Sequence, residues 1–395
     1  MVNFTALSFL ASFSIRMINM NKVILIGGDH YNGLSLVRLF GKQGLKPHGL
    51  IIGPSADKGF LRASKYWEHV DTLESNEGIV DYLLTNYSME EEVPVVIPWS
   101  DGAADAIDSS LDVLGEKFTL PSISGRQGAL SALMDKASQV AFADNCGLRT
   151  AQTVEVKLED GIIPDVPYPC IGKPVSSIEG KKRDIRRMDT KEELDEYLTA
   201  LRDEGYSRIL IQEFLDVNAE YDVEGYVNGN DACYYSVRKY RTWPNVGGPT
   251  AYAVSDRNDA LDAVMTRVLN YLKAIGYSGL FDVELFKVGD SFLFNEINWR
   301  NSAVCFAAVA AGINYPLYWY ESVCGRDPGQ PPAEENGRTA ICELLDMHNA
   351  RKVGVATWLR QLSKSDAYAY YDSSDMAPVR QRFQYSLASH IKRSK

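Results

Sequence analysis

The first 120 residues alternate between short apolar runs and amphipathic stretches. Apolar runs of strand length cover Lys22 to Gly28, Leu50 to Ile52 and Val95 to Pro98. Apolar residues recur at helical spacing from Asn32 to Gln43 and from Gly102 to Leu114. Continuous apolar runs are typical of strands buried on both faces, and their alternation with helices is typical of an open, mostly parallel sheet. The pattern therefore predicts an α/β domain at the start of the chain.

The pattern changes after residue 130, where strands follow one another without a helix between them. The predicted strands are 168–174, 184–188, 209–215, 220–227 and 232–241, and the predicted helices are 131–145, 190–204 and 259–275. Strands joined by short connections are typical of antiparallel pairing. We therefore expect an α+β region behind the α/β domain.

The stretch from Gly279 to Asn301 predicts a β-hairpin, because two aromatic-rich apolar runs flank residues 288–290. Side chains alternate across a strand, so every second residue shares a face. Glu284 and Glu296 are separated by an even number of positions, and they share a face only if the connecting loop has an odd number of residues. We expect a three-residue loop with Gly289 or Asp290 at positive φ.

The resulting face would carry Asp282, Glu284, Glu296 and Asn298, with Arg300 one strand step further on. Clustered acids among apolar residues repel one another and lose hydration, and a hard divalent cation removes that cost. Oxygen-only ligands with open positions suit Mg²⁺ better than zinc. An ordinary hairpin with a solvated acidic face stays open as the alternative, because acids two residues apart are common on surfaces.

Composition narrows the classes of protein. The 395 residues suffice for two or three packed domains. The net charge of −11 argues against a nucleic-acid binder without a concentrated basic patch. Six Cys without a CxxC pair favour reduced thiols in a cytosolic protein. The apolar run in residues 1–19 has no basic segment before it, is too short to span a bilayer, and is left out of the predicted fold.

The glycine turn after the first strand does not match a nicotinamide-binding motif. The sequence Gly27-Gly28-Asp29-His30-Tyr31-Asn32-Gly33 lacks the GxGxxG spacing, and no acidic residue ends the second strand. A nicotinamide oxidoreductase is therefore disfavoured. Open sheets bind ligands at the carboxyl ends of their strands, so Gly28, Ser100 and Asp101 could still contribute to a substrate site.

Six short motifs in order resemble the ATP-grasp superfamily, most closely its carboxylate–amine ligase branch, of the D-aspartate ligase and L-amino acid ligase type. The motifs are Met134-Asp135-Lys136 with Gly147-Leu148-Arg149-Thr150, Lys173-Pro174, Gln212-Glu213-Phe214-Leu215, Glu220, Glu284 in DVELF, and Asn295-Glu296-Ile297-Asn298-Trp299-Arg300. They cover roughly residues 20 to 325. Trp299 stands where a proline is common in the family.

The resemblance implies an ATP-grasp fold of α/β and α+β parts. It implies an N-terminal Rossmann-like pre-ATP-grasp domain at 20–125 and an ATP-grasp domain at 126–330. Within the latter, a small lid at roughly 150–215 would face a larger C-terminal part. Residues 331–395 are expected as a C-terminal extension packing on the ATP-grasp domain, with a strand into a loop at 338–346 and a helix at 352–362.

The resemblance also implies how ATP is bound. Lys136 and Lys173 would contact the nucleotide phosphates, as lysines neutralise phosphate charge. The main chain and side chain of the Glu213–Leu215 hinge, next to Gln212, would bind adenine, and Glu220 would bind the ribose. Residues 176–182 occupy the place of the phosphate loop but hold one glycine where the family has several. Ser177 is the loop residue that we expect at the phosphates, through its backbone as well.

By the same resemblance, Glu284, Glu296 and Asn298 would hold Mg²⁺, with Mn²⁺ as a possible substitute, and Arg300 would stabilise the transferred phosphoryl group. The basic residues Arg238, Lys239 and Arg241 lie on one strand. They fit either a surface strip or a site for a substrate carboxylate or the γ-phosphate, and we include Arg238 and Lys239 among the catalytic candidates. No His lies in a catalytic or metal-binding motif.

The sequence therefore predicts an ATP-dependent ligase. It would activate a carboxylate as an acyl phosphate, join it to an amine and release ADP and phosphate. Two alternatives stay open: another acceptor, bicarbonate or a thiol, and a nucleotide-binding module without turnover. The expected partners are small-molecule acids and amines, without nucleic acid or membrane. We expect a cytoplasmic protein, with a homodimer as a possible assembly.

Overall fold

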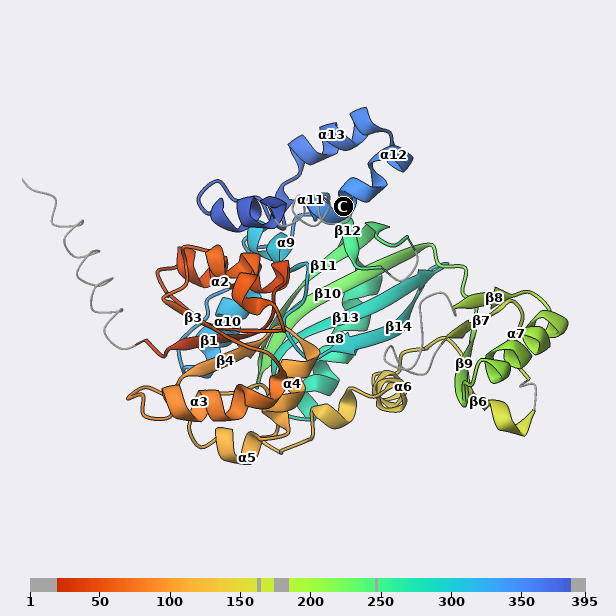
Figure 1. The fold of residues 1–395 in the computed structure, drawn as a ribbon, viewed down its shortest axis with the longest axis horizontal. Coiled ribbons are helices and arrows are strands. Elements are labelled where there is room, and N and C mark those ends of the chain that lie inside the picture. Colours follow the sequence, from red (N-terminus) through yellow and green to blue (C-terminus); the bar gives the residue numbers. More distant parts are fainter. Residues whose placement is uncertain (1–19, 162–164, 174–184, 246–247, 385–395) are drawn as a thin grey trace, which may run out of the picture.

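The computed structural model describes residues 20–161, 165–173, 185–245 and 248–384. Its N-terminal domain is a four-stranded parallel sheet in the order β3-β2-β1-β4 (Figure 1). The strands are β1 (Val23–Gly28), β2 (His48–Ile52), β3 (His69–Leu73) and β4 (Val95–Pro98). The helices are α2 (Tyr31–Lys42), α3 (Ile79–Tyr87), α4 (Asp101–Asp108) and α5 (Leu111–Leu114). The predicted α/β domain is confirmed, except that the single helix expected at 102–114 is two helices.

The lid is a second four-stranded sheet, in the order β6-β9-β7-β8, packed on one helix. Its elements are β6 (Thr153–Lys157), β7 (Cys170–Lys173), β8 (Arg186–Met188), α7 (Lys191–Asp203) and β9 (Arg208–Glu213). Figure 1 shows it at the opposite end of the molecule from the N-terminal domain. The helix α6 (Lys136–Asn145) lies before it in the chain.

The largest sheet lies between these two parts and has the order β14-β13-β10-β11-β12-β15-β16, with β5 paired to β13 (Figure 1). Its strands are β5 (Ser122–Ile123), β10 (Ala219–Asn228), β11 (Asp231–Thr242), β12 (Thr250–Ser255), β13 (Tyr277–Val288), β14 (Ser291–Asn298), β15 (Thr339–Ile341) and β16 (Ala367–Tyr368). The helix α8 (Asp259–Ala274) packs on one face, and α9 (Cys305–Ala310) and α10 (Tyr315–Val323) contribute to the core on the other.

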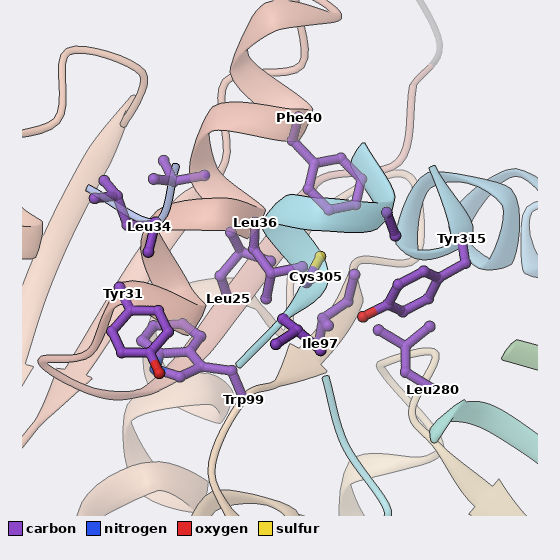
Figure 2. Close-up of a cluster of buried hydrophobic side chains, with 14 of the residues drawn as sticks. Leu25, Tyr31, Leu34, Leu36, Phe40, Ile97, Trp99, Leu280, Cys305 and Tyr315 are labelled. Carbon is purple, nitrogen blue, oxygen red and sulfur yellow. The ribbon is translucent and has the colours of Figure 1, made fainter. Parts of the chain in front are cut away.

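A continuous apolar core joins the N-terminal domain to the large sheet. Figure 2 shows Leu25, Phe40 and Ile97 of the N-terminal domain packing toward Leu280 of β13 and Tyr315 of α10. All five side chains are buried. The N-terminal domain is therefore held firmly against the sheet face that carries Leu280.

The C-terminal extension adds two strands to the large sheet and then returns to the N-terminal domain. Strand β15 pairs with β12, and β16 pairs with β15. The helices are α11 (Glu343–Asp346), α12 (Ala350–Val353), α13 (Val355–Lys364) and a last one at 377–384. The single helix expected at 352–362 is broken at Gly354, whose φ of 91° lies in the left-handed region that ends helices.

The predicted hairpin is present as β13 and β14, but its connection differs from the expectation. Val288 pairs with Ser291, so the turn has two residues, Gly289 and Asp290, and the three-residue loop was wrong. Gly289 has the expected positive φ, 58°. A β-bulge at Asn295 supplies the extra residue, because Leu285 pairs with Phe294 and Glu284 with Glu296. Glu284 and Glu296 therefore share a face as predicted, but the bulge at Asn295, and not a loop with an odd number of residues, brings them there.

Candidate functional site

One face of the large sheet carries a set of carboxylates on three adjacent strands. Glu284 of β13 is the register partner of Glu296 on β14 and of Asp222 on β10. One step along, Asp282 pairs with Asn298 and with Glu224. Residues in register across antiparallel strands point to the same face, so these side chains form one acidic face. The hairpin prediction that Glu284 and Glu296 share a face is confirmed.

Lys239 of β11 neutralises part of this acidic face. Its Nζ lies 2.7 Å from Asp222 Oδ1 and 2.9 Å from Glu284 Oε2, and its side chain is 6% exposed. Burial disfavours the charged lysine, but the two carboxylates outweigh burial and raise the pKa of Lys239 well above its ordinary value. The lysine is therefore a fixed positive charge in the middle of the site.

Two carboxylates of the acidic face have raised pKa values. Loss of hydration and the neighbouring Glu284 raise the pKa of Glu296 to about 7, although the residue is exposed to solvent at the cleft and Lys239 and Arg300 oppose the shift. Burial also raises the pKa of Glu220 on the same face, against the attraction of Lys239. A cation at this face would lower both values.

The donor set fits Mg²⁺ rather than a softer metal. Glu284, Glu296 and Asn298 offer only oxygen atoms from side chains in register or two residues apart. Among the described residues, no group of three or more His, Cys, Asp and Glu side chains is placed to hold a metal ion. Mg²⁺ at this hairpin would therefore need further oxygen ligands, of the kind that phosphate groups provide.

Arg300 links the acidic face to the N-terminal domain. Its Nε donates to Asp101 Oδ1 at 2.9 Å, and its Nη2 donates to Asn298 Oδ1 at 3.1 Å. Asp101 is the first residue of α4, at the carboxyl end of β4. The N-terminal domain therefore contacts the acidic face through Asp101, and the contribution of its strand ends to a substrate site stays a prediction.

A cleft of about 620 Å³ separates the lid from the large sheet. Lys173 and Gln212 line it from the lid, and Phe286, Glu296 and Asn298 line it from the sheet. Lys173 Nζ donates to Gln212 Oε1 at 2.9 Å. The cleft thus brings Lys173, predicted at the phosphates, and Glu296 and Asn298, predicted at the metal, to opposite walls of one space.

The chain leaves the lid through the segment predicted to bind adenine. Glu213 accepts from Arg149 Nη2 at 2.8 and 3.0 Å, and its own N–H donates to Gln152 O. The Phe214 N–H donates to Pro169 O, and the guanidinium of Arg187 lies 4.3 Å from the Phe214 ring. Hydrogen bonds thus connect Glu213 to the residues just before β6 and connect Phe214 to the lid.

The arrangement of a parallel-sheet domain, a lid and a large antiparallel sheet around a cleft recurs in solved structures. The L-amino acid ligase from Bacillus licheniformis superposes with a TM-score of 0.56 at 19% identity, over 75% of this chain and 72% of the ligase. The N5-carboxyaminoimidazole synthetase from Staphylococcus aureus complexed with ADP superposes with a TM-score of 0.59 at 16% identity, over 82% of this chain and 81% of the synthetase.

The chain has the ATP-grasp fold.

Sequence comparison adds a partial match to a curated enzyme. The formate-dependent phosphoribosylglycinamide formyltransferase of Pseudomonas putida (strain W619) is 30% identical over 148 residues. The chain spans about a third of the length of the curated relatives it matches (35%). No family model matches the chain. In the part of the chain that the structure describes, every helix is too short or too polar to traverse a bilayer.

Arg238 is not brought together with the rest of the predicted site, and Arg241 does not lie in a surface strip. Arg238 pairs with Tyr221, on the opposite face of β11 from Lys239, and its guanidinium lies 5.1 Å from the Tyr240 ring. Alternation along the strand therefore removes Arg238 from the catalytic set. Arg241 is no surface residue either, because it forms a buried ion pair with Asp346.

Two further predictions fall on residues whose placement is not described. Ser177 lies outside the described residues. Lys136 begins α6, but its side chain is outside the description as well. The roles of both at the phosphates stay predictions.

Sequence reasoning missed Asp222 and underrated Glu224. Both lie on β10 at even spacing from Glu220, and both are buried, at 5% and 0% exposure. Their spacing in the sequence could have predicted them, because Glu220, Asp222 and Glu224 stand at every second position and therefore share one face of a strand. It did not tell which face is covered, because that depends on α9, α10 and the N-terminal domain.

Proposed function

We propose that the chain is an ATP-dependent ligase that activates a carboxylate as an acyl phosphate and joins it to an amine, with release of ADP and phosphate. The observation that carries the proposal is that Glu296, the register partner of Glu284, lies on one wall of the cleft, opposite Lys173. Acids that hold a cation and a lysine that faces it are what a triphosphate needs on its two sides. The ATP-grasp fold and the likeness to a ligase and a formyltransferase support it.

The nucleotide would lie in the cleft between lid and sheet. Lys173, with Lys136 and Ser177, would neutralise its phosphates. The hinge that follows Gln212, made of Glu213, Phe214 and Leu215, would bind adenine, and Glu220 would bind the ribose. The Glu213 side chain is already engaged by Arg149, so we assign the adenine contact mainly to the hinge main chain.

Glu284, Glu296 and Asn298 would hold Mg²⁺, or Mn²⁺ in its place. The bound ion would neutralise and bridge phosphate oxygens. Arg300, fixed by Asp101 and Asn298, would place a positive charge beside the transferred phosphoryl group. Lys239 would provide a second positive charge at the acidic face. Its side chain is buried, and burial would strengthen its attraction to a phosphate.

The test is release of ADP from Mg·ATP with mixed amino acids, with bicarbonate and a small thiol as separate arms. Glu296→Gln keeps the size of the side chain and removes the metal-binding charge, so ADP release should fall at least about 100-fold with an unchanged melting temperature. Asp290→Asn, in the exposed turn of the same hairpin, is the matched control and should retain full release.

Three results would count against the proposal. Full turnover by Glu296→Gln would refute the metal role of this residue. ADP release that is stimulated only by bicarbonate or only by the thiol would show that the acceptor is not an amine. ATP binding without ADP release in any arm of the assay would show that the chain is a nucleotide-binding module without turnover.

A further inference from the structure

A second cavity borders the acidic face at β10 and β11. It measures about 480 Å³ and is bounded by the start of β10, the end of β11 and the C-terminal extension. Glu220 and Lys239 line it from the acidic face. Asn349 and Lys352 line it from the extension. A ligand in this cavity would thus touch both the predicted catalytic face and a part of the chain that the predicted function does not use.

Arg241 is held rigidly at this cavity. Its Nε and Nη2 donate to the two oxygens of Asp346 at 2.7 and 2.6 Å, and its guanidinium lies 4.1 Å from the Tyr252 ring. Asp346 is fully buried and also accepts from Asn349 Nδ2 and Trp358 Nε1. Two of the five guanidinium N–H donors serve Asp346, and among the described residues no other acceptor takes the remaining donors, which could serve a ligand.

Among the charged residues that line the cavity, Lys239, Arg241 and Lys352 are basic and Glu220 is acidic. Lys239 and Arg241 are already balanced by buried carboxylates behind them. Lys352 is exposed and has no ion-pair partner within the described part of the chain. Its charge, together with the donors of Arg241, is available to a ligand. Val217 and Val353 add apolar wall.

We propose that this cavity binds a second anionic group of the acid substrate, anchored by Arg241 and Lys352, so that the ligase prefers an acid with an additional carboxylate or phosphate. The proposal rests on the proposed function for the identity of the ligand as the acid substrate. A purely structural Arg241–Asp346 pair would only attach the extension to the sheet. Such a pair would affect the melting temperature but would not discriminate between acids that differ in one charge.

The experiment measures binding to the full chain by calorimetry in the presence of Mg²⁺ and a non-hydrolysable ATP analogue. The ligands are three matched pairs: L-glutamate and L-glutamine, L-aspartate and L-asparagine, and O-phospho-L-serine and L-serine. Within the preferred pair, the acidic member should bind at least about tenfold more tightly than its neutral partner, as expected for a charge-assisted contact. The pairs also distinguish a carboxylate from a phosphate.

Two variants locate the contact. Lys352→Gln is exposed and should fold normally, and it should weaken binding of the acidic ligand about threefold. The double variant Arg241→Gln/Asp346→Asn removes both charges of the pair without leaving one buried alone, and it should weaken binding at least about tenfold. Arg351→Gln, exposed and next to Lys352, is the matched control and should bind like the wild type.

The inference would be overturned if the acidic and the neutral ligand of each pair bound equally well. It would also be overturned if both variants bound the acidic ligand as tightly as the wild type. Weakened binding of the ATP analogue with unchanged binding of the acids would also overturn it, because the cavity would then belong to the nucleotide. The expected binding pattern without ADP release would support the anion site and refute the proposed function alone. ADP release stimulated equally by the neutral acids would leave the proposed function standing without this site.

Discussion

Tyr315 has one hydroxyl proton and two acceptors within hydrogen-bonding distance. Its oxygen lies 2.9 Å from Glu224 Oε2 and 2.9 Å from Asn301 Oδ1. The Asn301 amide nitrogen donates to Ser302 O and Asn32 Oδ1, so Asn301 Oδ1 can only accept. If Tyr315 donates to Asn301, Glu224 must carry a proton and donate to Tyr315. Burial raises the pKa of Glu224 to about 8, more than its hydrogen bonds lower it, which agrees with a protonated side chain.

Glu224→Gln should therefore stabilise the protein at high pH. The folded-state pKa is raised, so the stability that this group contributes is fully present below its unfolded pKa near 4.5 and is lost as pH rises through about 8. Glutamine can accept from Val304 N and donate to Tyr315 without titrating. We expect similar stability of variant and wild type at pH 5. At pH 8.5 the variant should be more stable by on the order of 3 kcal/mol.

Denaturant unfolding at the two pH values measures this difference. The exposed Glu116→Gln should show no pH-dependent gain and serves as the control. A variant that loses stability equally at both pH values would show that Glu224 is ionised in the folded protein.

At the scale of elements, local patterns in the sequence predicted α7, α8 and most strands of the lid and the large sheet, because apolar periodicity reports burial directly. They did not predict α9 and α10. The face shared by Glu284 and Glu296 was predicted as well. The bulge at Asn295 was not, because nothing in the residues distinguishes a bulge from a longer turn. The positions of Arg238 and Asp222 depend on which face of the sheet is covered, and that is set by distant segments.

The lid depends on a close approach between β7 and α7. A Cβ at Gly172 would lie 2.2 Å from Cε1 of Tyr197, and Tyr197 is buried in the lid core. Gly172→Ala should therefore push α7 from the sheet and destabilise the lid by about 2 kcal/mol. Lys173 follows directly, so the KM for ATP should rise together with the loss of lid stability.

Amide hydrogen exchange of β7 and β9 and the KM for ATP measure the two effects. Thr199→Ala, at an exposed position of α7, is the control and should leave both unchanged. Normal exchange protection in Gly172→Ala would show that Tyr197 can move aside without cost.

At the scale of the whole molecule, the C-terminal extension is the part that sequence patterns described least. It was expected to pack on the ATP-grasp domain, and β15 and β16 do extend the large sheet. Its last part instead packs on the N-terminal domain. Arg38 of α2 donates to Asp375 Oδ2 at 3.1 Å and to the carbonyl of Tyr370. Such contacts join residues more than 300 positions apart, and a single sequence gives no local signal for them.

Asp375 is the centre of this attachment and provides the last prediction. It is 2% exposed and also accepts from Ser64 Oγ and Lys65 N. Asp375→Ala would leave the guanidinium of Arg38 buried without its carboxylate, which typically costs about 3 kcal/mol. The neighbouring Asp372 lies 4.0 Å from Arg38 Nε and pairs closely with Lys42, whose side chain is 46% exposed, so solvent screens the Asp372–Lys42 ion pair. Asp372→Ala should therefore cost no more than about 1 kcal/mol.

Hydrogen exchange of α2 separates the two variants, because it reports opening of the N-terminal domain even where unfolding of the whole chain is not two-state. Protection of α2 should fall strongly in Asp375→Ala and little in Asp372→Ala. The N-terminal domain supplies Asp101 to Arg300, so loosening it should also lower ADP release in Asp375→Ala. If both variants lose the same protection, the buried ion pair does not hold the N-terminal domain, and the apolar core of Figure 2 alone keeps it in place.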